Sequence, residues 1–397
     1  MSLNNTPSAN RVHIGIFGKR NAGKSSVMNV LTNQNLAIVS DVKGTTTDPV
    51  LKAMELLPLG PVVMIDTPGI DDEGELGALR IKKSYQMLNK TDIAVVIIDG
   101  AEESAEDKQL IEKIKAKNVP YVIFHNKSDT FTAEKKEGHL YGSALEKIGI
   151  DELKQVIVTL ANSEDNDKKI VADLIEPLDI VVLVVPIDAA APKGRLILPQ
   201  QQTIRDILDA GAVSVVVKDT ELKETLAKLG TKPKLVITDS QAFGKVSAIV
   251  PDDIQLTSFS ILFARYKGSL ETAVKGAAAI EQLKDGDKIL ISEGCTHHRQ
   301  CGDIGTVKLP NLLKKYTGKS FDFEFTSGTE FPEDLSDYRL VIHCGGCMLN
   351  EREMKYRYLC AAEQNVPITN YGTAIAYMNG ILKRSVAPFE EIQKLLK

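Results

Sequence analysis

The feature that most constrains this chain is an eight-residue pattern close to its start. Residues 18–25 read GKRNAGKS, which satisfies the full G-x-x-x-x-G-K-S/T pattern. The apolar run from Arg11 to Phe17 reads as a strand, and Ser25 to Leu31 reads as the start of a helix. A glycine-rich turn between a strand and a helix aims backbone N–H groups at phosphate. The sequence therefore predicts a P-loop nucleotide-binding domain built on a parallel α/β sheet.

Each position of this loop has an expected contact with nucleotide. Lys24 is expected to place its charge on the β- and γ-phosphates and so to act in catalysis, and the Ser25 hydroxyl is expected to ligate Mg²⁺. The remaining loop positions predicted to contact the nucleotide are Gly18, Asn21, Ala22, Gly23 and Ser26.

Two further motifs follow in the order that GTP hydrolysis requires. Residues 44–48 read GTTTD, where Thr46 is the expected metal ligand. Residues 66–69 read DTPG and come directly after a predicted strand. Asp66 is expected to hold Mg²⁺ through water, and the Gly69 N–H is expected to meet the γ-phosphate. Thr46, Asp66 and Gly69 therefore join Lys24 as predicted catalytic residues.

A third motif predicts the identity of the base. Residues 126–129 read NKSD, so Asn126, Lys127 and Asp129 are candidate base contacts. Asp129 can accept hydrogen bonds from N1 and the 2-amino group of guanine, and adenine offers neither donor. Ser143 and Ala144 are expected to complete the base loop. The predicted ligands are GTP and GDP with Mg²⁺.

The arrangement of apolar runs predicts an α/β chain of three domains. Strand-like runs separated by helical patterns recur along the whole sequence, as in parallel sheets covered by helices. We expect a P-loop GTPase domain over 1–165, a small α/β domain over 166–263, and a C-terminal α/β domain over 264–397.

Charge and hydropathy argue against several function classes. The formal net charge is −5 and the sequence pI is about 5.8, so the strongly basic surface of a nucleic-acid-binding protein is not expected. The polar start MSLNNTPSANR does not resemble a signal peptide, and no apolar run is long enough to cross a bilayer. The sequence predicts a soluble, cytoplasmic protein without a nucleic-acid or membrane partner.

All five cysteines lie in the C-terminal segment. An odd count in a cytoplasmic chain argues against a disulfide framework, and the clustering indicates a metal site. The candidate ligands, each at the end of a predicted strand, are Cys295, His297, His343, Cys344 and Cys347. Three thiolates suit three irons of a [4Fe–4S] cluster, and with one histidine they suit zinc equally well. Cys301 reads as a loop thiol, His298 as a loop histidine and Cys360 as a buried apolar residue.

The nucleotide motifs resemble those of the tRNA-modification GTPase and of Era. Within that branch, an asparagine at the position of Asn21 ligates potassium in some members, so the resemblance implies a candidate K⁺ site there. The residue after DTPG is Ile70. Since this side chain cannot orient water, we expect slow GTP hydrolysis, stimulated by potassium.

The G domain together with Cys295-x-His297 and His343-Cys344-x-x-Cys347 resembles the [FeFe]-hydrogenase maturation GTPases, the HydF family. The resemblance covers essentially the whole chain. It implies a [4Fe–4S] cluster on the three cysteines, with His297 and His343 on or near it, and a homodimer formed by the middle domain. It further implies a scaffold that receives a transient diiron precursor from radical-SAM maturases and delivers it to apo-[FeFe]-hydrogenase.

Two alternatives from other classes stay open at this point. The first is an RNA-modification or ribosome-assembly GTPase with a structural zinc site, which would bind RNA in a salt-dependent way. The second is a zinc enzyme regulated by its G domain, although no nearby carboxylate suggests a general base. Colour and iron content after anaerobic reconstitution separate both from the scaffold.

Overall fold

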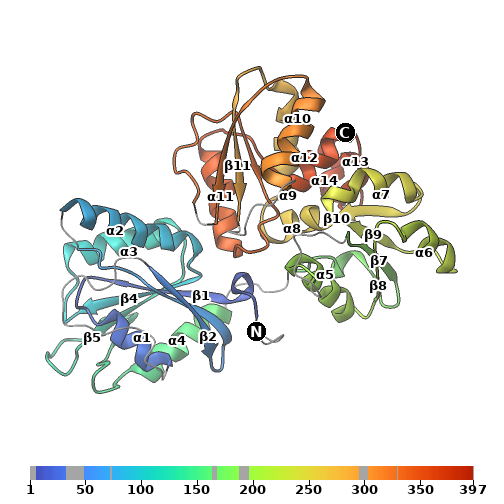
Figure 1. The fold of residues 1–397 in the computed structure, drawn as a ribbon. Helices are drawn as coiled ribbons and strands as arrows, with labels where there is room; N and C mark the ends of the chain where they lie inside the picture. Colours follow the sequence, from blue (N-terminus) through green and yellow to red (C-terminus); the bar gives the residue numbers. More distant parts are fainter. Residues whose placement is uncertain are drawn as a thin grey trace. The chain divides into compact units, whose positions relative to one another are not determined.

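The chain forms two compact units, residues 1–167 and 168–397, each described by itself (Figure 1). The structure is a computed structural model. It describes the following residues: 6–32, 49–71, 74–162, 168–186, 196–294, 303–328 and 330–396. The predicted α/β fold class is confirmed in both units, because strands and helices alternate along each.

The first unit is built on a six-stranded sheet of order β2-β3-β1-β4-β5-β6. The strands are β1 (Val12–Gly18), β2 (Val50–Leu56), β3 (Gly60–Asp66), β4 (Ile93–Asp99), β5 (Tyr121–Asn126) and β6 (His139–Tyr141). All neighbours pair in parallel except β2, which runs antiparallel to β3. Sequence reasoning missed β2 because this edge strand alternates exposed with partly buried residues and shows no apolar run.

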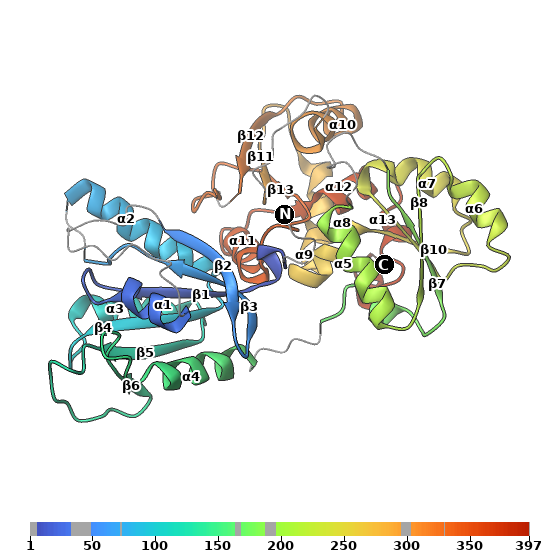
Figure 2. The same ribbon diagram turned by 60° about the horizontal axis from the view of Figure 1, so that its bottom comes forward.

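Helices cover both faces of this sheet (Figure 2). They are α1 (Lys24–Thr32), α2 (Gly74–Met87), α3 (Ala105–Ala116) and α4 (Ile150–Asn162). Alternate residues of one strand enter opposite cores: Ile16 packs with residues of α1 and α4, and Phe17 packs with residues of α3. Burial on both faces explains why these strands read as continuous apolar runs.

The second unit contains two four-stranded parallel sheets. The first has the order β10-β9-β7-β8 and is formed by β7 (Ile180–Val184), β8 (Val213–Val217), β9 (Leu235–Thr238) and β10 (Gln255–Ser258). The second has the order β12-β11-β13-β14 and is formed by β11 (Lys288–Glu293), β12 (Asp322–Ser327), β13 (Leu340–His343) and β14 (Ile368–Asn370).

The helices of the second unit pack on the two sheets in separate hydrophobic clusters. They are α5 (Leu198–Asp209), α6 (Leu222–Lys228), α7 (Phe243–Ile249), α8 (Phe259–Lys267), α9 (Leu270–Ala278), α10 (Leu309–Thr317), α11 (Glu351–Glu363), α12 (Tyr371–Met378), α13 (Leu382–Ser385) and α14 (Glu390–Gln393). Leu382 and Val386, near the end of the chain, are buried in the same cluster as Val182 and Phe243 of the first sheet. The expected boundary at 263/264 therefore falls inside α8, whose apolar residues belong to this shared core.

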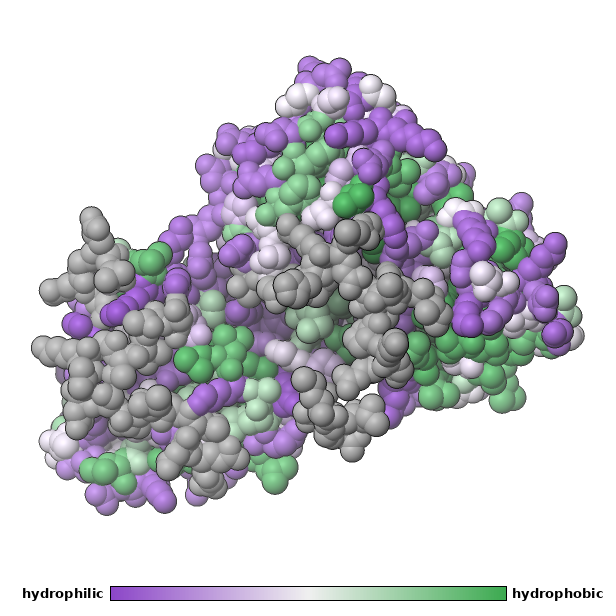
Figure 3. Space-filling view, in the orientation of Figure 1, coloured by the Kyte–Doolittle hydropathy of each residue, from purple (hydrophilic) through white to green (hydrophobic). Residues whose placement is uncertain are grey.

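The outer edge of the first sheet of this unit is apolar. β8 pairs only with β7 among the described strands, and its Val213 and Val216 are both more than two-fifths exposed. Apolar surface gathers over this part of the unit (Figure 3). Among the described residues, no helix is both long and apolar enough to traverse a bilayer.

Candidate nucleotide and cysteine sites

The predicted P-loop lies between β1 and α1. Its backbone takes left-handed or related conformations at Gly18 (φ 143°), Asn21 (φ 58°) and Gly23 (φ 90°). A Cβ at Gly23 would lie 2.2 Å from the Asn126 amide nitrogen, so only glycine fits there. Lys24 donates from Nζ to the carbonyls of Gly18 (3.0 Å) and Lys19 (2.7 Å), which folds its ammonium group over the loop.

Ser25 and Asp66 lie together, as a magnesium site requires. The Ser25 hydroxyl donates to Asp66 Oδ2 at 2.8 Å. The other carboxylate oxygen, Oδ1, is buried without a hydrogen-bond partner among the described residues. Burial raises the pKa of Asp66, while the Ser25 hydrogen bond and the Lys24 charge act to lower it. A divalent cation bound here would give the Asp66 Oδ1 atom a partner and would offset the free-energy cost of burying the carboxylate.

The base loops are braced by one buried amide. Asn126 donates to Ala22 O of the P-loop (2.9 Å) and accepts from the Ala144 N–H (3.0 Å), so it ties three predicted contact segments together. Lys127, next to it, forms an ion pair with Asp99 at 2.8 Å, a partner that sequence reasoning missed. Asp129 is exposed, where an incoming base can reach it.

Of the other nucleotide residues, Gly69 is buried against Arg20, and Ser26 is partly buried in the first turn of α1. Ser143 is buried and its hydroxyl accepts from the Glu146 N–H at 3.2 Å. Thr46 lies outside the described residues.

The predicted cysteine ligands follow neighbouring strands. β11 and β13 pair with Ser292 opposite His343, so both strands end at the same edge of the sheet. The Cys344 N–H continues the ladder by donating to Ser292 O at 2.9 Å. Gly294 is the last described residue before the segment that holds Cys295, and its N–H donates to Cys344 Sγ at 3.0 Å. Cys295 and His297 themselves lie outside the described residues, as do His298 and Cys301.

Backbone N–H groups surround the Cys344 sulfur, although burial disfavours its thiolate form. Cys344 Sγ accepts from Gly294 and, at 3.4 Å, from the Gly346 N–H. Burial and the neighbouring Cys347 raise the pKa of Cys344 to about 11, and burial also raises the pKa of Cys347. Both groups are therefore neutral thiols, and a metal ion that bound them would have to displace their protons. Gly346 (φ 64°) turns the loop where a side chain would collide with Met354.

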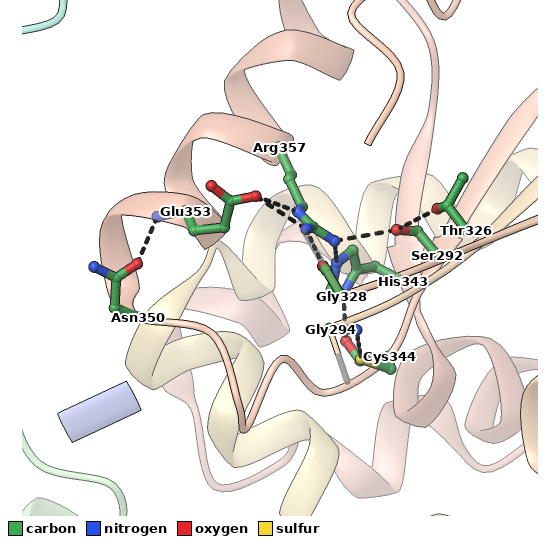
Figure 4. Close-up of polar contacts among 9 residues, drawn as sticks. All are labelled: Ser292, Gly294, Thr326, Gly328, His343, Cys344, Asn350, Glu353 and Arg357. Carbon is green, nitrogen blue, oxygen red and sulfur yellow. Dashed lines mark hydrogen bonds and ion pairs between the residues drawn. The ribbon is translucent and has the colours of Figure 1, made fainter. Parts of the chain in front are cut away.

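A fully buried arginine lies beneath this loop (Figure 4). Arg357 of α11 donates to Glu353 Oε1 from Nε at 3.0 Å and from Nη2 at 2.9 Å. It also donates to Ser292 Oγ (3.2 Å) and Gly328 O (2.7 Å). It also lies 2.9 Å from His343 Nε2 and over the ring of Phe331. Its only sequence signal is the i, i+4 spacing from Glu353 on a predicted helix.

These contacts fix the tautomer of His343. Nδ1 lies 2.7 Å from Cys344 O and so carries the proton, which leaves Nε2 to accept from Arg357. Burial, followed by the Arg357 charge, lowers the pKa of His343 to about 3, so the ring is neutral. Both ring nitrogens of His343 are engaged in hydrogen bonds. This geometry favours a role in supporting the cysteine loop, and it disfavours direct ligation of a metal by His343.

A second buried cation, Lys267 of α8, holds the other end of the cysteine loop. Its ammonium group donates to Cys347 O at 3.3 Å and to Leu349 O at 2.9 Å. Burial lowers its pKa to about 8. Cys360 is buried elsewhere and donates toward the carbonyls of Pro332 and Glu333, as expected of a structural cysteine.

Comparison with known proteins matches three separate parts of the chain. Residues 13–127 match the family described as 50S ribosome-binding GTPase. The tRNA modification GTPase MnmE of Bacteroides thetaiotaomicron is 31% identical over 172 residues, which cover 38% of this chain and 36% of that protein. MnmE of a Thermoanaerobacter species is 35% identical over 156 residues, 36% of this chain and 33% of that protein. The chain thus spans little more than a third of these relatives.

Among solved structures, Era of Aquifex aeolicus bound to GDP and aluminium fluoride is 19% identical, with a TM-score of 0.35 over 52% of this chain and 92% of that one.

The rest of the chain matches two models of a single family. Residues 170–268 match the hydrogen maturase F dimerization domain, and residues 271–388 match the hydrogen maturase F tetramerization domain. Since these two matches span more than half of the sequence and follow a GTPase domain, the chain belongs to the hydrogen maturase F family of GTPases.

Proposed function

We propose that this protein is a GTP-binding scaffold that carries a [4Fe–4S] cluster on Cys295, Cys344 and Cys347 and a diiron precursor for delivery to apo-[FeFe]-hydrogenase. One observation carries the cluster site: the Gly294 N–H donates to Cys344 Sγ at 3.0 Å. Gly294 directly precedes Cys295 in the sequence. This supports convergence of the three thiolates.

The residues described around the sulfurs fit such a cluster. Backbone N–H groups point at Cys344 Sγ, and buried cations lie on two sides of the cysteine loop. When bound, the cluster would supply one iron without a cysteine, to which a guest ligand can attach. The protein's part is to hold the thiolates and to offset their negative charge through Lys267 and Arg357.

Replacing Cys344 by serine tests this proposal. We expect anaerobically reconstituted Cys344→Ser protein to lose most of its iron and its charge-transfer absorption, because a serine hydroxyl is a poor ligand for iron–sulfur clusters. Cys360→Ser is the matched control, since Cys360 is buried away from the loop and should leave the iron content unchanged. Full iron content in Cys344→Ser, or zinc in place of iron in the parent protein, would contradict the cluster.

The Lys267 charge is expected to set the potential of the cluster. Substituting methionine keeps the length of the side chain and removes the cation that faces the cysteine loop. Loss of a nearby positive charge disfavours the more negative, reduced cluster, so the midpoint potential should fall by an amount on the order of tens of millivolts. EPR-monitored redox titration measures it, with Lys275→Met as the control, since this side chain lies on the exposed face of α9. An unshifted potential would show that Lys267 is structural only.

We further propose that the G domain hydrolyses GTP slowly and that bound GTP controls contacts with partner proteins. Ile70 is buried beside the Gly69 loop and offers no group to orient water, which supports slow hydrolysis. Asn21 is exposed in a left-handed conformation at the loop tip, where its side chain is available to K⁺. We assign GTP the role of biasing contacts with the radical-SAM maturases and the hydrogenase through the loops near Thr46 and Asp66.

The apolar edge strand supports a homodimer. β8 leaves backbone hydrogen-bonding groups on one side without a strand partner among the described residues, and Val213 and Val216 are exposed. Such an edge pairs readily with a second copy. The dimerization and tetramerization domains matched by this chain agree with oligomer formation.

A further inference from the structure

Three side chains outside the nucleotide and cysteine sites form a ligand cluster in the first unit. They are Glu103 in the loop after β4, His125 on β5 and His139 on β6, and their candidate ligand atoms lie within 4.8 Å of one another. No step of the proposed nucleotide chemistry uses them. We propose that they bind a divalent transition-metal ion, with zinc the best match to two imidazoles and one carboxylate.

The spacing of the ligand atoms fits a tetrahedral ion. His125 Nε2 and His139 Nδ1 are 3.0 Å apart, and His139 Nδ1 lies 3.6 Å from Glu103 Oε1. Zinc bonds of about 2.0–2.1 Å at tetrahedral angles separate neighbouring ligand atoms by about 3.3–3.4 Å. These two distances fall on either side of that value, and all three ligand atoms lie within 4.8 Å of one another, so rotation of the partly exposed Glu103 and His139 side chains can bring them around one ion.

One histidine is already fixed in the tautomer that a metal needs. His125 Nδ1 lies 2.9 Å from Gly100 O and donates its proton there, so the lone pair of Nε2 points at His139. The ring is fully buried and stacks on Tyr141 with centroids 4.5 Å apart. Burial also lowers the pKa of His125, which keeps the ring neutral. Without metal, His139 Nδ1 carries a proton and donates it to His125 Nε2. When a metal binds, His139 takes its other neutral tautomer, which frees the Nδ1 lone pair for the ion.

The other two ligands give the ion access and an open position. The side chains of Glu103 and His139 are 15% and 16% exposed. Lys136 competes for the carboxylate, because its Nζ lies 3.4 Å from Glu103 Oε1. Its side chain is about half exposed and can turn into solvent when the ion enters. Two imidazoles disfavour Mg²⁺, so the magnesium that accompanies GTP does not compete.

The experiment uses the full-length chain with Cys295, Cys344 and Cys347 changed to serine, so that the proposed thiolate site takes up no zinc. Calorimetric titration with ZnCl₂ should give one site, and Co²⁺ should give d–d absorption without a sulfur charge-transfer band. His139→Gln should weaken zinc binding at least tenfold, and Lys136→Met should strengthen it. Glu102→Gln, an exposed neighbour of Glu103, is the matched control and should bind as the parent does.

Folding of each variant is checked by binding of a fluorescent GDP analogue, since Glu103, Lys136 and His139 are not among the predicted nucleotide contacts. Where His139→Gln fails that check, Glu103→Gln replaces it, with the same expected loss. Absence of a zinc site in the parent, or equal zinc affinity in the parent and the ligand variants, would overturn the proposal and leave only a hydrogen-bonded histidine pair.

Discussion

Asp129→Asn is expected to transfer the preference of the G domain from GTP to xanthosine triphosphate. The Asp129 carboxylate can accept from both N1–H and the 2-amino group of guanine, whereas an asparagine amide offers one acceptor and two donors. Losing a charged pair of hydrogen bonds should weaken GTP binding at least about 100-fold. Xanthine carries an oxygen in place of the 2-amino group. The asparagine N–H can donate to this oxygen, so xanthosine triphosphate should gain a hydrogen bond where GTP loses one. Fluorescent-nucleotide titration measures both affinities.

The control for this exchange is Glu137→Gln, which neutralises an exposed carboxylate between β5 and β6. Its affinity for GTP should match that of the parent. Asn126 braces the loop in both proteins through Ala22 and Ala144, so the scaffold of the base site stays in place. An Asp129→Asn protein that keeps its GTP affinity would show that another residue reads the base.

Arg357→Met is expected to cost the second unit about 3–5 kcal/mol of unfolding free energy. The arginine is fully buried, and its removal leaves the buried Glu353 carboxylate without a counter-charge. Gly328 O and His343 Nε2 lose a donor at the same time. Urea unfolding followed by circular dichroism measures the shift. Lys355→Met on the exposed face of α11 is the control and should change stability by less than about 1 kcal/mol, because it removes only a surface ion pair.

A double variant separates the charge pair from simple packing. Because a buried ion pair contributes little net stability relative to apolar residues of similar volume, Arg357→Met/Glu353→Met should recover much of what Arg357→Met loses. If the double variant is no more stable than the single one, the uncompensated Glu353 charge is not the cause of the loss.

The sequence was most informative where function depends on short, local patterns. The P-loop, DTPG and NKSD motifs each follow a strand that is buried on both faces of the sheet. Such a strand is recognised in the sequence by its continuous apolar run. The structure confirms those strands within a few residues. It adds β2, β6, β10 and β14, which are short or lie at sheet edges and so leave little periodicity to detect.

Only the tertiary structure determines which residues that are distant in the sequence contact one another. The spacing Cys344-x-x-Cys347 indicates a ligand pair, but the register of β11 against β13 is what sets Gly294 on the Cys344 sulfur. No local pattern ties Arg357 to His343, or Glu103 to His139, because those contacts arise from side chains on separate elements. The sequence by itself determined the nucleotide motifs and the candidate thiolates, since local backbone geometry needs particular residues. The charges and tautomers around them depend on packing, which is a property of the folded chain.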